Sequence, residues 1–149
     1  MNQPDANWFL KRIRIQTGGP GLTEITGDIR PFLDSRASGL LTLFVSHTSC
    51  SLLIQENADP DVQTDLLAYL ERLVPPSNHP SMSYLRHTLE GPDDMPAHIK
   101  AAFLPTFLSI PVQDGQMRLG TWQGVFLVEH RARPHIREVV LQFSGHSPA

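Results

Sequence analysis

The stretch FLSIPVQDGQMRLGTWQGVFLVEHRARPHIREVVLQFS, residues 107–144, decides the fold. It divides into four segments rich in β-branched and aromatic residues, which predict strands over residues 107–112, 116–119, 122–130 and 136–144. The run Gln113-Asp114-Gly115 between the first two segments is typical of a hairpin turn. This end of the chain therefore predicts an antiparallel sheet.

The first half of the chain adds three strands to this sheet. Residues 8–16, WFLKRIRIQ, alternate isoleucine with arginine in the way that a half-buried strand does. Residues 40–46, LLTLFVS, and residues 51–55, SLLIQ, are rich in residues that suit strands.

Helices are expected between and after these strands. Residues 23–36 predict a helix, although Pro31 would kink or end it. A second helix is predicted over residues 60–73, because an aspartate that can cap the helix precedes a proline at its first position. A long polar loop, residues 75–97, leads into a short third helix over residues 96–104.

Length and composition limit the classes of protein that the chain can represent. Its 149 residues, 40% hydrophobic, are enough for one core, and we expect a single α+β domain, residues 1–149, dominated by antiparallel sheet. The net charge of −3 argues against nucleic-acid binding, and no apolar run is long enough to span a membrane. The single cysteine cannot form an intrachain disulfide, and residues 1–9 lack a signal-peptide pattern, so we expect a cytoplasmic protein.

Three of the seven histidines lie in contexts that suit a site. His47 follows an apolar strand, and His87 and His98 flank a segment dense in carboxylates and turn-forming residues. Three neutral imidazoles from separate segments can supply the three protein ligands of a catalytic zinc site, which keeps a fourth position open. The alternative is that they brace loops through hydrogen bonds.

Five further residues are candidates for chemistry or binding. Glu129, in an apolar strand, is a candidate general base, metal ligand or orienting group, unless it faces solvent. Arg86, Lys100 and Arg118 are candidate anion-binding residues, with solvated surface charge as the alternative. Cys50 is either a nucleophile or, as we favour, a small buried residue.

Six segments stand out together: SHTSCSL (46–52), ENADP (56–60), RH (86–87), GPDDMPAHIK (91–100), LGTWQ (119–123) and Glu129. In this order and at this spacing they resemble the YjbQ-like (secondary thiamine-phosphate synthase) family. The resemblance covers the chain from about residue 8 to residue 144. One departure is Pro105-Thr106, where the family pattern leads us to expect a glycine-containing turn.

The resemblance implies a fold, an assembly and an activity. The fold is a compact α+β domain whose antiparallel sheet curls into a half-barrel, and the assembly is a homotrimer. The activity is the synthesis of thiamine phosphate from a pyrimidine diphosphate and a thiazole phosphate. The family's site histidines correspond to His47, His87 and His98, and its acidic strand residue corresponds to Glu129.

Three functions remain open on the sequence. A thiamine-phosphate synthase-like transferase needs anion-binding residues and Mg²⁺ on oxygen ligands such as Asp93, Asp94 or Glu129. A metal-dependent hydrolase or lyase would hold a divalent metal such as zinc on the three histidines, with Glu129 as base. The third function is a non-catalytic trimeric protein that binds a small ligand or a metal. In both enzymatic readings we expect a small, anionic substrate.

Overall fold

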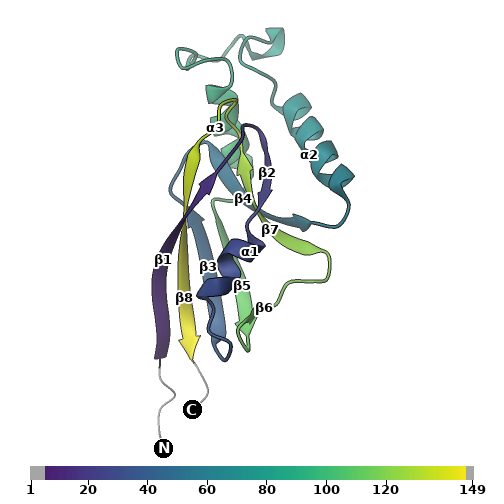
Figure 1. Cartoon of the computed structure of the whole chain (residues 1–149). Coiled ribbons are helices and arrows are strands. Elements are labelled where there is room, and N and C mark those ends of the chain that lie inside the picture. Colours follow the sequence, from purple (N-terminus) through teal and green to yellow (C-terminus); the bar gives the residue numbers. More distant parts are fainter. Residues whose placement is uncertain (1–5, 147–149) are drawn as a thin grey trace, which may run out of the picture.

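The computed structural model of the chain describes residues 6–146 and contains two antiparallel sheets. The larger sheet has the strand order β1-β8-β3-β5-β6 and curls into a half-barrel, as the family resemblance implied (Figure 1). Its strands are β1 Ala6–Gln16, β8 Ile136–His146, β3 Ser38–Val45, β5 Phe107–Gln113 and β6 Gln116–Met117. The smaller sheet has the order β2-β7-β4, with β2 Gly21–Glu24, β7 Gln123–Glu129 and β4 Cys50–Glu56.

The core fills the concave side of the half-barrel. Alternate residues of β3 and β8 face inward and meet in register, so that Leu41 lies opposite Phe143 and Leu43 lies opposite Leu141. Leu127 of β7 is also fully buried in this cluster, which joins the two sheets. The period-two pattern of strands such as β3 and β5 therefore has its physical origin in one buried and one more exposed face, whereas β7 is buried on both faces and reads as a continuous apolar run.

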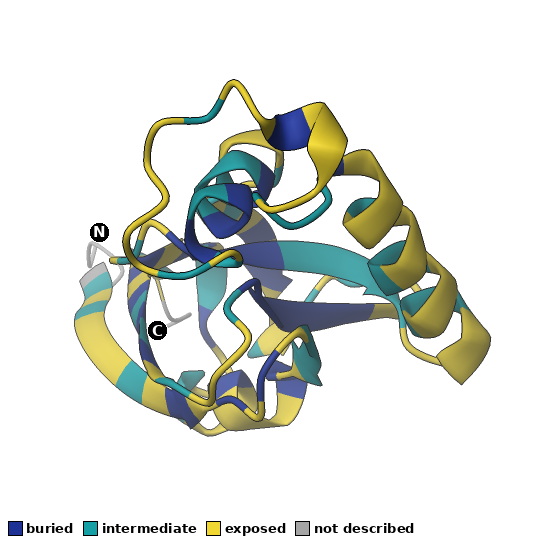
Figure 2. Cartoon of the chain, turned by 90° about the horizontal axis from the view of Figure 1, so that it is seen from above, coloured by how far each residue is buried: buried dark blue, intermediate teal, exposed yellow. Residues whose placement is uncertain are grey.

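Two longer helices pack beside the sheets. Helix α2, Pro60–Leu73, begins as expected, because the Asp59 side chain accepts a hydrogen bond from the backbone N–H of Asp61 at 2.9 Å. None of its residues is buried, and Figure 2 shows it as a largely exposed helix at the edge of the molecule. Helix α3, Asp94–Phe103, begins two residues earlier than expected and buries Asp94 and Lys100.

The predicted helix over residues 23–36 is wrong. Residues 21–24 form β2, and only the short helix α1, Thr26–Ile29, and the 3₁₀ turn η1, Arg30–Phe32, follow it. Hydrogen bonding to β7 overrides local helix propensity here, since Thr23 lies opposite Leu127 in the smaller sheet. Pro31 is accommodated because it occupies the start of the 3₁₀ turn, where its missing N–H is not needed.

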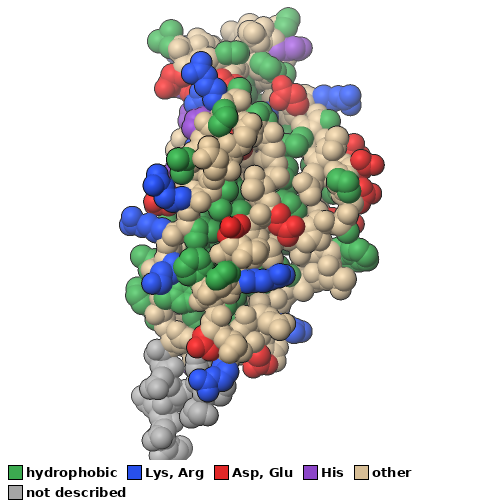
Figure 3. Space-filling model, viewed as in Figure 1, with side chains coloured by type: hydrophobic (Ala, Val, Ile, Leu, Met, Phe, Trp, Pro, Cys, Tyr) green, Lys and Arg blue, Asp and Glu red, His purple; other side chains and the backbone are tan. Residues whose placement is uncertain are grey.

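The register of the smaller sheet determines which segments meet at one end of the molecule. Cys50, the first residue of β4, lies opposite Glu129, the last residue of β7. The segments that precede β4 and follow β7 therefore leave the sheet side by side, at the end where α3 lies (Figure 1). Acidic, basic and histidine side chains gather at this end of the surface in Figure 3. Within residues 6–146 no helix has the length and apolar character needed to cross a bilayer.

Candidate metal centre

Two of the predicted histidines meet at one carboxylate. Oδ2 of Asp94 lies 2.6 Å from Nε2 of His87 and 3.4 Å from Nε2 of His98. One ligand atom from each of the three side chains lies within 4.8 Å of the other two. Two imidazole nitrogens and a carboxylate oxygen at this spacing can hold a single divalent ion.

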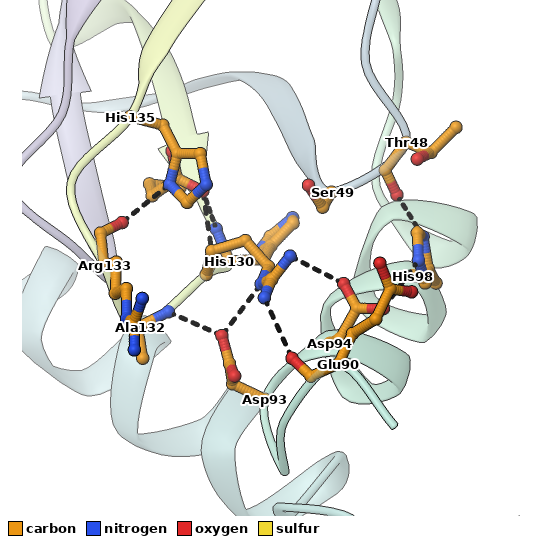
Figure 4. Close-up of polar contacts among 12 residues, drawn as sticks. Thr48, Ser49, Glu90, Asp93, Asp94, His98, His130, Ala132, Arg133 and His135 are labelled. Atoms are coloured by element: carbon orange, nitrogen blue, oxygen red, sulfur yellow. Dashed lines mark hydrogen bonds and ion pairs between the residues drawn. The ribbon is translucent and has the colours of Figure 1, made fainter. Parts of the chain in front are cut away.

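Local structure brings these three side chains together. Asp94 is the first residue of α3 and His98 lies one turn later, so both side chains are on the same face of the helix. His87 comes from the loop before α3, which folds back so that its ring meets that of His98 edge-on, with ring centres 5.6 Å apart. Nδ1 of His98 donates to the carbonyl oxygen of Thr48 at 2.9 Å (Figure 4). That bond fixes the tautomer and leaves Nε2 free to act as a ligand.

Arg131 holds the other oxygen of the shared carboxylate. Its Nη1 lies 2.7 Å from Oδ1 of Asp94, and its Nε donates to Oδ2 of Asp93 at 2.8 Å. Burial raises the pKa of Asp94, but the hydrogen bond from His87 and the positive charge of Arg131 outweigh it, so the pKa is lowered. Asp94 is therefore an anion, as a metal ligand must be.

Glu90 brings a second carboxylate to the open side of this group. Its Oε2 lies 2.9 Å from Nε2 of His87, and its side chain is 63% exposed. Because Glu90 is reachable from solvent and close to a candidate ligand, it is in a position to exchange protons with water near the group.

His47 does not join the other two histidines in this chain. Its Nε2 accepts a hydrogen bond from the backbone N–H of Glu138 at 2.8 Å, which directs the ring toward β8. Burial, followed by the positive charge of Arg137, lowers the pKa of His47. The sequence suggested three histidine ligands, whereas the structure brings together two histidines and Asp94.

Glu129 is enclosed rather than presented to a substrate. Its carboxylate accepts hydrogen bonds from Arg137, from the Thr17 hydroxyl at 2.8 Å, and from the backbone N–H groups of His130 and Arg131. Burial raises the pKa of Glu129, but the hydrogen bonds from Arg137 and from the backbone N–H of Arg131 outweigh burial, so the pKa is lowered. The alternative that Glu129 faces solvent is wrong, since only 1% of the residue is exposed. Its surroundings favour an orienting role over that of a general base.

The buried ion pair also connects to the candidate metal centre. Besides Glu129, Arg137 donates to the carbonyl oxygen of Ser49 at 3.2 Å and to the Ser49 hydroxyl at 2.9 Å. Ser49 follows Thr48, the residue whose carbonyl orients His98. The Glu129–Arg137 pair therefore helps to hold the segment against which a candidate ligand is fixed.

Comparison with known proteins identifies the family of this chain. A sequence model of the family described as UPF0047 protein YjbQ-like matches residues 11–146. The chain belongs to this family. UPF0047 protein sll1880 of Synechocystis is 50% identical to the YjbQ-like chain over 133 residues, which are 88% of either protein. UPF0047 protein YjbQ of Escherichia coli is 36% identical over 141 residues, 93% of this chain and 99% of that protein.

Solved structures of YjbQ-like proteins agree with the fold. A conserved hypothetical protein of Thermus thermophilus is 37% identical, with a TM-score of 0.78 over 89% of this chain and 98% of that chain. A YbjQ-like protein of unknown function from Sulfolobus solfataricus is 22% identical, and its TM-score of 0.77, over 95% of this chain and 99% of that one, concerns the fold alone.

The three anion-binding candidates of this YjbQ-like protein lie in different places. Arg86 is exposed, in the loop that carries His87. Lys100 is largely buried on α3, and its Nζ donates to Oε2 of Glu71 at 3.1 Å. Arg118 is exposed and follows β6, where its backbone N–H donates to the carbonyl oxygen of Pro111 in β5 at 2.8 Å. The structure thus does not gather them into one anion site.

Sequence reasoning missed three arginines of the site. Arg131, Arg133 and Arg137 follow Glu129 in the sequence, and the partners that give Arg131 and Arg137 their roles, Asp93 and Asp94 for the first and Ser49 for the second, are distant in sequence. A signal was present, because the run Arg131-Ala132-Arg133 follows an apolar strand in the same way that His47 does. Cys50 is fully buried, and burial raises the pKa of its thiol to about 11, which agrees with a small buried residue rather than a nucleophile.

The buried His130 makes stability depend on pH. Its Nε2 lies 2.9 Å from the Ser51 hydroxyl, and burial, followed by the charge of Lys100, lowers its pKa from 6.5 to about 4. The unfolded chain therefore binds a proton at a higher pH than the folded chain does, and folding stability falls as the pH falls from 6.5 toward 4. The expected contribution is roughly 3 kcal/mol.

Urea unfolding between pH 8 and pH 4 measures this effect. The acidic groups with lowered pKa add a loss of stability in the same direction, so the informative quantity is the difference between the native chain and His130→Gln. Glutamine places a polar atom near the Ser51 hydroxyl but does not titrate. The stability of His130→Gln is expected to fall less steeply below pH 6.5; parallel curves for the two chains would show that His130 is not the group responsible.

Proposed function

We propose that this YjbQ-like protein is a metal-dependent hydrolase or lyase that acts on a small anionic substrate. The divalent ion would be held by His87, Asp94 and His98. The observation that carries the proposal is the convergence of these three ligand atoms within 4.8 Å, at the exposed end of a rigid sheet.

The donor set suits a transition metal. Two imidazoles and one carboxylate are typical ligands of catalytic zinc, and they also suit iron and related ions. Magnesium prefers a shell of oxygen atoms, which the two imidazoles do not supply. A bound ion would polarise the substrate and lower the pKa of water at the site.

The chain's own residues supply the remaining roles. Glu90, exposed and 2.9 Å from His87, is the candidate general base, which takes a proton from the attacking water or from the substrate. Arg131 keeps Asp94 ionised and oriented through its second oxygen. Glu129, whose oxygens are occupied by four donor residues, supports the segment behind His98 instead.

Replacing the candidate base separates catalysis from metal binding. Glu90→Gln is expected to keep the metal content of the native protein and to lose about 10²- to 10⁴-fold in kcat, because the amide cannot accept a proton. Hydrolysis of p-nitrophenyl phosphate by zinc-loaded protein is the assay. Glu71→Gln is the matched control, since Glu71 is also exposed and ion-paired but contacts Lys100. Equal kcat for Glu90→Gln and the native protein would remove Glu90 from the mechanism.

The second candidate is a thiamine-phosphate synthase-like transferase. The acidic residues Glu90, Asp93 and Asp94 favour it, because their oxygens are the donors that Mg²⁺ prefers. Asp93 is less accessible, however, since its Oδ2 is bonded to Arg131 and to the N–H of Ala132. The transferase would be supported if the protein forms thiamine phosphate in the presence of Mg²⁺ and if His98→Ala keeps this activity. Metal and anion binding without turnover in either assay would leave a non-catalytic binding protein.

We also propose that the chain assembles as a homotrimer in the cytoplasm. Large apolar side chains are exposed on α2, where Tyr69 is 65% exposed, and on the convex face of the larger sheet, where Trp8 and Phe44 lie. Such surfaces are commonly covered by other copies of the chain. Sedimentation equilibrium tests the assembly against a chain mass of 16.6 kDa. The proposed location in the cytoplasm is supported by the lone cysteine, which fits a reducing compartment.

A further inference from the structure

A cavity of about 440 Å³ opens beside the candidate metal centre. One wall is the loop from Leu89 to Asp93, and the other is the segment from Arg131 to Arg133. Glu90 belongs both to this wall and to the group around His87. A molecule in the cavity would therefore lie next to the three candidate ligands.

The charged side chains of the cavity wall differ in whether they already have a protein partner. Arg131 is fully engaged, because it pairs with Asp93 and Asp94 and donates to the backbone oxygen of Glu90 at 3.3 Å. The carboxylate of Glu90 is directed to His87. The exposed guanidinium of Arg133 has no hydrogen bond or ion pair within residues 6–146. The cavity therefore carries one cation without a protein partner.

The backbone that bears this cation is held in place. The carbonyl oxygen of Arg133 lies 2.7 Å from Nδ1 of His135 (Figure 4). His135 is fixed in turn, since its backbone N–H donates to the Thr17 hydroxyl at 2.9 Å and its carbonyl accepts from the N–H of Thr17 at 2.8 Å. The fixed backbone limits the region that the free guanidinium can reach, and its planar fork can bind two oxygens of an oxyanion at once.

We propose that Arg133 and the cavity beside it form the subsite that recognises the oxyanion group of a small substrate, either a phosphate or a carboxylate. Where the reacting part of that substrate lies rests on the proposed function, whereas the anion subsite itself does not depend on that function. Arg133 takes the role that the sequence suggested for Arg86, Lys100 and Arg118. Its charge attracts the substrate and sets the orientation in which the substrate reaches the metal centre.

Calorimetric titration of the full-length, chelator-treated protein with inorganic phosphate, and separately with acetate, tests the subsite without any metal. The native protein is expected to bind at least one of the two anions, and Arg133→Gln is expected to weaken that binding at least about tenfold, as loss of a charged hydrogen bond does. Whichever anion binds more tightly identifies the class of head group. Arg118→Gln is the matched control, since Arg118 is also exposed but its backbone is bonded to Pro111 of β5 and it does not line this cavity.

The outcomes distinguish this subsite from the proposed function. Equal anion binding by Arg133→Gln and the native protein, an equal loss in Arg118→Gln, or no binding of either anion by the native protein would each overturn the subsite. Thermal unfolding checks that the variants are folded, and Arg133→Lys is expected to recover part of the affinity. If the native protein binds no transition metal but Arg133→Gln still loses the anion, the subsite stands and the metal-dependent reaction fails.

Discussion

Arg137→Gln is expected to lower the free energy of unfolding by about 3–5 kcal/mol, because it leaves the buried carboxylate of Glu129 without its charged partner. Glu129 would keep the Thr17 hydroxyl and two backbone donors, which do not neutralise its charge. The Ser49 carbonyl and hydroxyl would lose a donor as well. Urea unfolding at pH 7 measures the change.

A surface ion pair supplies the comparison for this buried pair. Arg12 and Glu138 approach to 3.9 Å, and the Arg12 side chain is 67% exposed, so Arg12→Gln is expected to change stability by less than about 1 kcal/mol. The double replacement Glu129→Leu with Arg137→Met removes both buried charges and is expected to be less destabilising than Arg137→Gln alone. A loss below about 1 kcal/mol for Arg137→Gln would mean that Glu129 is not held as a buried anion.

His98→Ala is expected to weaken zinc binding by at least about 100-fold, a loss at least as large as that for residues that only orient a ligand. The cost in folding stability is expected to be below about 2 kcal/mol, because the side chain is partly exposed and lies outside the core. Competition with a chromophoric chelator measures the affinity, and elemental analysis of the purified protein measures the stoichiometry.

Two other histidines serve as controls for this prediction. His79→Ala removes an exposed histidine that contacts Ser81 and is expected to leave zinc affinity unchanged. His47→Ala distinguishes the ligand set of the structure from the three histidines suggested by the sequence, since Nε2 of His47 already accepts a backbone hydrogen bond. If His47→Ala loses zinc while His98→Ala retains it, the group of His87, Asp94 and His98 is not the metal centre.

Much of the fold could be predicted because a strand that buries one face alternates in sequence, and a strand that buries both faces, such as β7, is a continuous apolar run. The alternation in residues 8–16 and the apolar runs at 40–46 and 122–130 appear as β1, β3 and β7. The helix over residues 23–36 failed because pairing with β7, a contact distant in sequence, decides the conformation of residues 21–24. Local propensity has no information about that partner.

The candidate site could be predicted only in part, for a related reason. His87 and His98 were found from their polar surroundings, whereas Asp94 was expected in the loop before a helix that starts at residue 96, so its place one turn before His98 on α3 was not predicted. The roles of Arg131, Arg133 and Arg137 depend on Glu129 lying opposite Cys50, which sets the segment after β7 beside the segment before β4. Those pairings are between segments distant in sequence, so local patterns carry no information about them.

The exposed helix α2 has a consequence for how the chain opens. Because none of its residues is fully buried, α2 gives up little packing when it detaches from the rest of the chain, and a helix of this length is only marginally stable on its own. Its amide protons should exchange with solvent through small local openings, long before those of the central strand β8 exchange through global unfolding. A copy of the chain that covers α2 would slow this exchange, so the dynamics of the helix would report directly on assembly.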